Sequence, residues 1–88
     1  MSIADYIKAF VEEHEEYTLY EGYSGQFMFG KSCLGVVISE GNSYMSFLME
    51  LTEYLCQQNV EDKDLALDGV SCDSLGLDTI VYFPRIEG

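Results

Sequence analysis

Two stretches of this chain repeat apolar side chains with the period of an α-helix, and residues that favour β-strands fill the chain between and after them. The first stretch predicts a helix over residues 2–15, in which Ser2 and Asp5 have the spacing of a capping box. Its apolar stripe consists of Ile3, Tyr6, Ile7, Phe10 and Val11.

The second stretch predicts a helix that is capped by Asn42 or Ser43 and ends within residues 57–59. It is expected to be the main helix packed on the sheet. Its stripe consists of Tyr44, Phe47, Leu48, Leu51 and Leu55, widened by Met45 and Met49.

Three further segments favour strands. Residues 17–23, with the sequence YTLYEGY, are aromatic and predict a strand followed by a turn. Residues 27–39 predict one long strand or two short ones broken near Gly30. Residues 78–83 are apolar on both alternations, which predicts a central strand that Pro84 ends.

The chain between the second helix and the last strand has a weaker pattern. Residues 60–63 are interpreted as a connector, residues 65–70 as a short strand and residues 71–77 as a loop. The 88 residues are expected to form one domain, residues 1–88. The order α-β-β-α-(β)-β predicts an α+β fold with two helices on one face of a small, mostly antiparallel sheet.

The charge of the chain restricts its partners. Sixteen Asp and Glu residues against four Lys and Arg give a formal net charge of −12. Self-repulsion at this density opposes folding, and solubility needs a charge of only about 2–8. Bare nucleic acid and anionic membranes have the same sign and are excluded, so a basic partner is expected. No signal peptide and no apolar run of about 18 residues is evident, which predicts a cytoplasmic protein.

Residues 25–32, with the sequence GQFMFGKS, fit the phosphate-binding pattern G-x-x-x-x-G-K-[ST]. That loop requires a helix to start at its Lys-Ser, whereas residues 33–39 here are β-branched and favour a strand. We therefore predict a hairpin or bent strand with Gly25 and Gly30 at its turns, and no nucleotide site.

Other catalytic and metal patterns are weak. The one histidine, His14, lies among glutamates and is predicted to be a solvated side chain. Residues 61–69 are rich in carboxylates but have Ala66 where a calcium loop requires a ligand. No catalytic, cofactor or metal site is predicted. Three cysteines without C-x-x-C spacing predict reduced, mostly buried thiols, namely Cys33, Cys56 and Cys72.

Four glutamates are predicted in the last turn of the first helix, where the helix dipole is negative and each anion costs about 0.3–1 kcal/mol. They are Glu12, Glu13, Glu15 and Glu16. Glu12 and Glu16 would also be like-charge neighbours four residues apart. Lys8 is the one basic residue in the same predicted helix, so little positive charge offsets the four glutamates. We interpret their negative charge as retained despite its cost in stability.

We therefore predict an acidic interaction surface; the alternative is a merely solvated face. Carboxylates four residues apart on a helix are about 6 Å apart along the helix axis. Successive phosphates on one strand of a duplex advance about 3.4 Å along the duplex axis, and flexible side chains can bridge the difference between the two spacings. Such a surface could fill a basic groove built for nucleic acid. Some tyrosines are also expected at the interface. The predicted partner-binding residues are Glu12, Glu13, Glu15, Glu16, Glu50, Glu53, Glu61, Asp62, Asp64, Tyr20 and Tyr23.

Residues 23–37 resemble a stretch of small phage and prophage proteins with the pattern G-R-G-M-[FY]-G-x-x-C-[LV]-[GA]-[VI]. The likeness covers about fifteen of the 88 residues, and Gln26 and Phe27 replace the Arg-Gly of the pattern. In size and acidity the chain also resembles the anti-CRISPR class of phage inhibitors, several of which are acidic α+β miniproteins that mimic nucleic acid. This resemblance implies a function but assigns no residue.

We therefore expect a non-enzymatic, phage-type inhibitor in the cytoplasm of a host bacterial cell. Its expected partner is a basic nucleic-acid-binding protein or ribonucleoprotein, such as a CRISPR effector, whose DNA or RNA site it would block. The alternative is a structural or regulatory binding module, or a homodimer joined through exposed Tyr and Met, whose acidity keeps it soluble. A small hydrolase or nucleotide binder is the third alternative.

Overall fold

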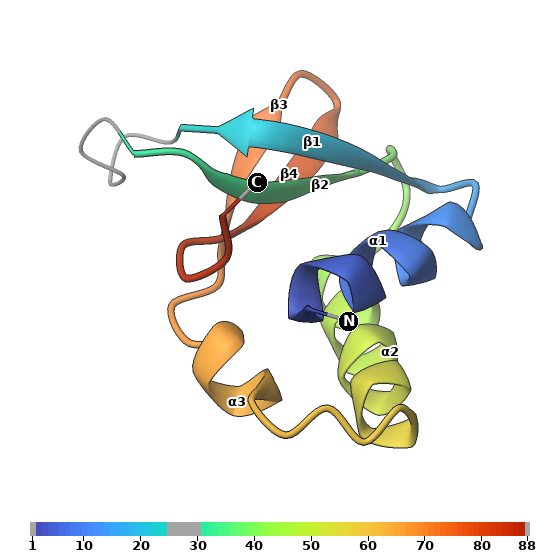
Figure 1. The fold of residues 1–88 in the computed structure, drawn as a ribbon. Coiled ribbons are helices and arrows are strands. Elements are labelled where there is room, and N and C mark those ends of the chain that lie inside the picture. Colours follow the sequence, from blue (N-terminus) through green and yellow to red (C-terminus); the bar gives the residue numbers. More distant parts are fainter. Residues whose placement is uncertain (1, 25–30, 88) are drawn as a thin grey trace.

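The computed structural model describes residues 2–24 and 31–87, which form helices on one side of an antiparallel sheet (Figure 1). The helices are α1 (Ile3–Glu12), α2 (Tyr44–Gln57) and α3 (Lys63–Ala66). The strands are β1 (Tyr17–Tyr23), β2 (Cys33–Ile38), β3 (Ser71–Leu75) and β4 (Asp78–Phe83).

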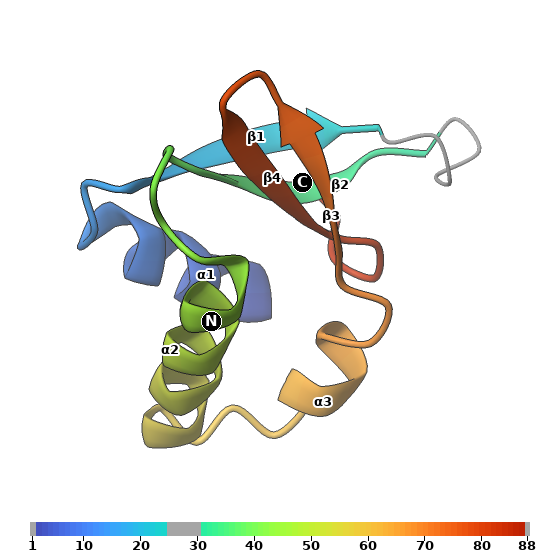
Figure 2. The ribbon, with the colours of Figure 1, turned by 180° about the vertical axis from the view of Figure 1, so that it is seen from behind.

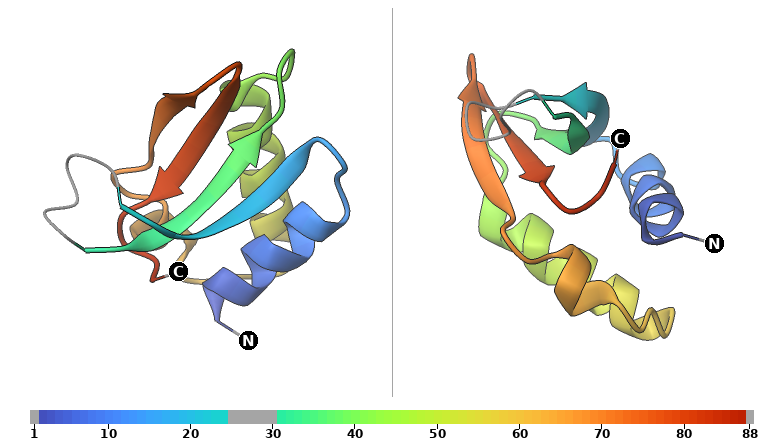
Figure 3. Two further views of the ribbon diagram at one scale, coloured as in Figure 1. Left: turned by 90° about the horizontal axis from the view of Figure 1, so that it is seen from above. Right: turned by 60° about the vertical axis from the view of Figure 1, so that its left-hand side comes forward.

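The sheet has the strand order β1-β2-β4-β3, and every neighbouring pair is antiparallel. Figures 1 and 2 show the helices below the sheet from front and back, and the view from above in Figure 3 shows α2 behind the strands and α1 alongside β1. The predicted α+β fold is confirmed. The predicted central strand is confirmed as well, because β4 pairs with β2 on one side and β3 on the other.

The core lies between this sheet and the helices because alternate strand residues point toward α1 and α2. Phe47 of α2 is at its centre, with ring centroids 6.0 Å from Phe10 of α1 and 6.5 Å from Phe83 of β4. Each large apolar side chain removed from water here contributes about 1.5–3 kcal/mol. The fully buried core residues of this layer include Ile7, Leu34, Val36, Ile38, Phe47, Leu51, Leu55, Val81 and Phe83.

The predicted capping box at the start of α1 is confirmed. The Asp5 amide donates to Ser2 Oγ at 3.3 Å, and the Ser2 amide donates to Asp5 Oδ2 at 3.1 Å. At α2, Ser43 is the N-cap, and its Oγ accepts from the Ser46 amide at 3.3 Å. Both helices therefore start where the sequence places them.

Two predicted elements are wrong. Residues 65–70 do not form a strand, because α3 and a turn occupy this part of the chain. Residues 71–77 are not a loop: residues 71–75 form β3, the edge strand next to β4. All five residues of this edge strand are half-exposed or exposed, so SCDSL needs no apolar pattern and gave no strand signal.

The predicted strand over residues 27–39 is described only in part. Residues 33–38 form β2, and residues 31–32 before it are not helical, as expected of a chain without a phosphate loop. The predicted turns at Gly25 and Gly30 lie outside the described residues.

Candidate acidic binding surface

Four glutamates lie at the end of α1 and in the turn before β1, but not in the helical arrangement that the sequence predicted. Glu12 is the last helical residue and Glu13 is the C-cap, so the helix ends three residues earlier than expected. Glu15 and Glu16 lie in the turn before β1. The dipole cost therefore applies to Glu12 and Glu13, and the predicted helical pair of Glu12 with Glu16 is wrong.

His14 closes the helix end, so its prediction as a solvated side chain is wrong. Its ring is half-buried, and Nδ1–H donates to the Phe10 carbonyl oxygen, 2.8 Å away. The ring lies 4.4 Å from that of Phe10 and 5.3 Å from that of Tyr17, between centroids. This packing fixes the turn, while the neighbouring Glu13 and Glu15 remain exposed.

Tyr17 brings a carboxylate of α2 to the same place. Its buried ring packs edge-on against Phe47 with centroids 4.8 Å apart, and its hydroxyl donates to Glu50 Oε2 at 3.3 Å. Burial, together with the negative charges of Glu50 and Glu16, raises the pKa of Tyr17 to about 12. Glu50 therefore contacts the Tyr17 hydroxyl directly, and Glu16 adds negative charge near it.

Two acids that the sequence reasoning missed join this group. The Ser39 amide donates to the Glu16 carbonyl oxygen at 3.0 Å, which ties the end of β2 to the α1–β1 turn. The next residue, Glu40, donates its amide to Asp78 Oδ1 at 2.9 Å. The sequence could have indicated this proximity, because Glu40 follows one predicted strand and Asp78 begins another. When two such strands pair antiparallel, the end of one lies beside the start of the other, at the same end of the sheet.

We call this region the acidic end. Figures 1 and 2 show the α1–β1 turn and the β2–α2 loop at the same side of the molecule. The ion pairs of the described chain lie elsewhere, between Lys8 and Glu21 at 2.9 Å and between Arg85 and Asp68 at 3.1 Å. The acidic end consists of Glu12, Glu13, Glu15, Glu16, Glu40, Glu50 and Asp78.

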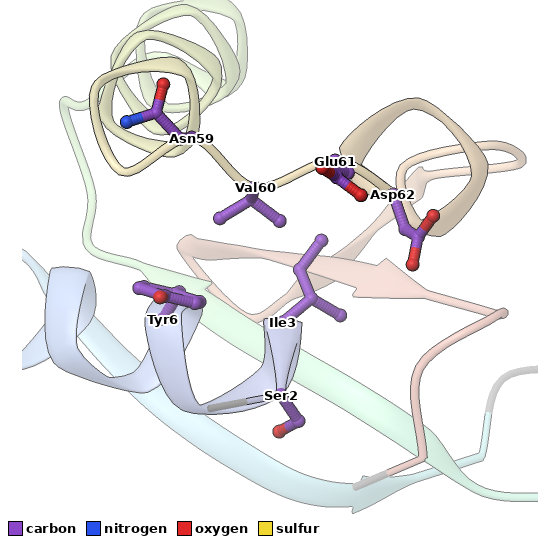
Figure 4. Close-up of a pocket in the computed structure, with 7 residues that line it drawn as sticks. All are labelled: Ser2, Ile3, Tyr6, Asn59, Val60, Glu61 and Asp62. Atoms are coloured by element: carbon purple, nitrogen blue, oxygen red, sulfur yellow. The ribbon is translucent and has the colours of Figure 1, made fainter.

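The predicted acids Glu61, Asp62 and Asp64 lie away from the acidic end. Glu61 and Asp62 line a hollow of about 340 Å³ between the connector and the start of α1, where Ile3 and Val60 point toward each other (Figure 4). The acidic end is at the other end of α1, and a helix of 10 residues is about 15 Å long. The hollow is lined by Ser2, Ile3, Tyr6, Asn59, Val60, Glu61 and Asp62.

Glu53 is separate from both groups. It lies on the outer side of α2, where it borders a shallow hollow together with Leu48, Met49 and Thr52. The predicted partner-binding acids therefore occupy three places. Five of them, Glu12, Glu13, Glu15, Glu16 and Glu50, lie at the acidic end.

Tyr20 and Tyr23 lie on the open face of the sheet, away from the helices. A register shift separates them in β1, with Gly22 at φ +73° between them. Tyr23 donates its hydroxyl to the Asp73 carboxylate of β3, and this bond together with burial raises its pKa to about 12. Because Tyr23 spans the face and covers Cys33, its side chain has a structural role, whereas Tyr20 is 43% exposed.

The cysteines and the possible metal ligands of the described residues were the remaining candidates for a functional site. Cys33 is buried but Cys56 and Cys72 are exposed free thiols, so the prediction of mostly buried thiols is wrong. In residues 2–24 and 31–87, no group of three or more His, Cys, Asp or Glu side chains is placed to hold a metal. Within the same ranges, no helix has the length and apolar character to cross a bilayer.

No protein-family model matches this chain, and no curated protein and no solved structure matches it significantly.

Proposed function

We propose that this protein is a non-enzymatic, phage-type inhibitor that acts inside a host bacterial cell. It binds the basic nucleic-acid-binding surface of a host defence complex, with a CRISPR effector as the leading candidate, and thereby blocks DNA or RNA binding. The observation that carries this proposal is the acidic end. Carboxylates from the α1–β1 turn, the β2–α2 loop, α2 and β4 gather there without a recorded ion pair among the described residues.

The construction of the acidic end supports a binding role. Glu50 is held by the Tyr17 hydroxyl and Asp78 by the Glu40 amide, so two of its carboxylates are oriented before a partner arrives. Preorganised acceptors lose little conformational freedom when Arg or Lys side chains approach them. The net charge of −12 also accelerates association with a basic groove.

A test compares two variants with equal loss of charge. The end variant carries Glu13→Gln, Glu15→Gln and Glu16→Gln. The control variant carries Glu61→Gln, Asp62→Asn and Asp64→Asn, and Asp62 makes no side-chain capping bond in α3. The affinity of each is measured against a panel of purified CRISPR effector complexes, with labelled target nucleic acid to report its displacement.

We expect the wild type and the control variant to displace nucleic acid equally, and the end variant to do so poorly. Exposed ion pairs contribute about 0.2–1 kcal/mol each, so three lost pairs reduce the affinity by about 3- to 150-fold. Equal weakening by the two variants would mean that only net charge matters. Failure of the wild type to bind any effector would reject the CRISPR assignment.

A binding module without nucleic-acid mimicry is the second candidate, favoured by Met45 and Met49, which are 60% and 69% exposed. In that case the chain would form a homodimer or bind a neutral partner. Its mass would rise with its own concentration, or its capture of a partner would not decline with salt.

A further inference from the structure

The outer side of α2 is apolar although it faces away from the core. The helix buries Phe47, Leu51 and Leu55 against the sheet, yet Met45 and Met49 on its other side are 60% and 69% exposed. A shallow hollow of about 400 Å³ adjoins them, lined by Leu48, Met49, Thr52 and Glu53. A helix with a second apolar side beyond its core stripe indicates a second contact.

This side of α2 can be covered at low cost. The Thr52 hydroxyl donates to the Leu48 carbonyl oxygen at 2.7 Å, so covering it leaves this donor paired. Methionine is flexible and polarisable, and it adapts to apolar side chains of different shapes. Glu53 is the one charged side chain that lines the hollow.

Charge complementarity identifies the occupant. A second copy of this chain would bring another net charge of −12 and a second Glu53 to the same contact. An anionic membrane is repelled for the same reason. A helix with apolar side chains flanked by Lys or Arg could fill the hollow with the former and pair with Glu53 through the latter. Met45 and Met49, four residues apart, form a ridge of the kind that packs between the ridges of another helix.

We infer that the outer side of α2, formed by Met45, Leu48, Met49, Thr52 and Glu53, docks a basic amphipathic helix of the partner protein. This inference rests on the proposed function in that the partner is basic. It adds an apolar contact to the charged one and explains how an acidic protein can prefer one basic partner over others.

The probe is a synthetic amphipathic helix of Leu and Lys, with two controls: the same composition in scrambled order, and oligolysine. Methyl NMR of Met45 and Met49 locates binding, and fluorescence anisotropy gives its affinity. The test variant is Met49→Glu, supported by Met45→Glu. The matched control is Leu77→Glu, which adds the same charge at a residue that is 79% exposed in the β3–β4 turn.

We expect the amphipathic peptide to shift both methionine methyl signals and the control peptides to leave them in place. Met49→Glu should weaken amphipathic binding at least about tenfold, although it makes the protein more acidic, and Leu77→Glu should not. Equal or tighter binding by Met49→Glu overturns the inference, as does equal binding of the scrambled peptide. A dimer that Met49→Glu dissociates also overturns it, because the occupant would then be a second copy.

The two proposals fail separately. If the peptide docks on α2 but replacing Glu13, Glu15 and Glu16 by Gln leaves effector binding unchanged, the proposed function fails and the docking surface stands. If those replacements weaken effector binding but Met49→Glu has no effect on the peptide, the docking surface fails alone.

Discussion

Neutralising the end of α1 should stabilise the protein. Glu12 ends the helix and Glu13 caps it, where the partial negative charge of the helix dipole opposes an anion by about 0.3–1 kcal/mol at low ionic strength. No basic residue lies in the last turn of α1 to offset this cost. The double substitution Glu12→Gln and Glu13→Gln should therefore raise the free energy of unfolding by about 0.6–2 kcal/mol.

Thermal unfolding followed by circular dichroism measures this gain. For a chain of this size a change of 1 kcal/mol moves the Tm by roughly 4–8 °C. Salt should reduce the difference between variant and wild type, because the Debye length falls from about 10 Å at 0.1 M to about 3 Å at 1 M. Glutamine has a helix propensity close to that of glutamate, so the comparison isolates the charge.

The control removes two charges outside any helix, by Glu61→Gln and Glu87→Gln, both at exposed positions. It measures the relief of general self-repulsion alone. The helix dipole is not the cause if the control stabilises the protein as much as the end substitutions do, if the end substitutions give no gain, or if the gain does not change with salt.

Three further substitutions test the structure. The free energy of unfolding should fall as the pH rises from about 10 through about 12, because the raised pKa values of Tyr17 and Tyr23 favour the neutral hydroxyls in the folded state. Tyr17→Phe should therefore reduce the fall in Tm between about pH 8 and about pH 11. An unchanged fall in Tm would contradict this cause. Gly35→Ala would place a Cβ atom 3.1 Å from the Tyr20 backbone oxygen and should cost about 1–3 kcal/mol in urea unfolding, whereas an unchanged midpoint would show that the sheet can yield there. Ser2→Ala removes the cap of α1 and should cost about 0.5–2 kcal/mol, measured by thermal unfolding, and no loss would mean that the capping box contributes nothing.

The sequence predicted those elements whose apolar pattern is set by the core. Both long helices and the strands β1, β2 and β4 have side chains that must face the helix–sheet layer, so their periodicity is visible in the residue order. Edge strand β3 has half-exposed and exposed side chains and gave no such signal. The four-residue α3 is too short for a helical period to be seen.

The acidic end was predictable only for residues near each other in the chain. Glu12, Glu13, Glu15 and Glu16 stand out as a run, whereas Glu40 and Asp78 join them through strand pairing between segments 38 residues apart. The half-buried position of His14 depends on contacts with Phe10 and Tyr17 at a helix end that fell earlier than the pattern indicated. The separation of Glu61, Asp62 and Asp64 likewise follows from the packing of the connector beside the start of α1.

Mutual exclusion between this protein and nucleic acid tests most directly whether the acidic end fills a nucleic-acid groove. A CRISPR effector that binds the chain would be loaded with guide and labelled target, mixed with excess protein, and followed by sedimentation velocity at low and at high salt. Protein and target should never sediment on the same effector particle, and displacement should decline steeply as the salt concentration rises. A stable particle that holds effector, target and this protein together would contradict the claim that the acidic end fills the nucleic-acid groove.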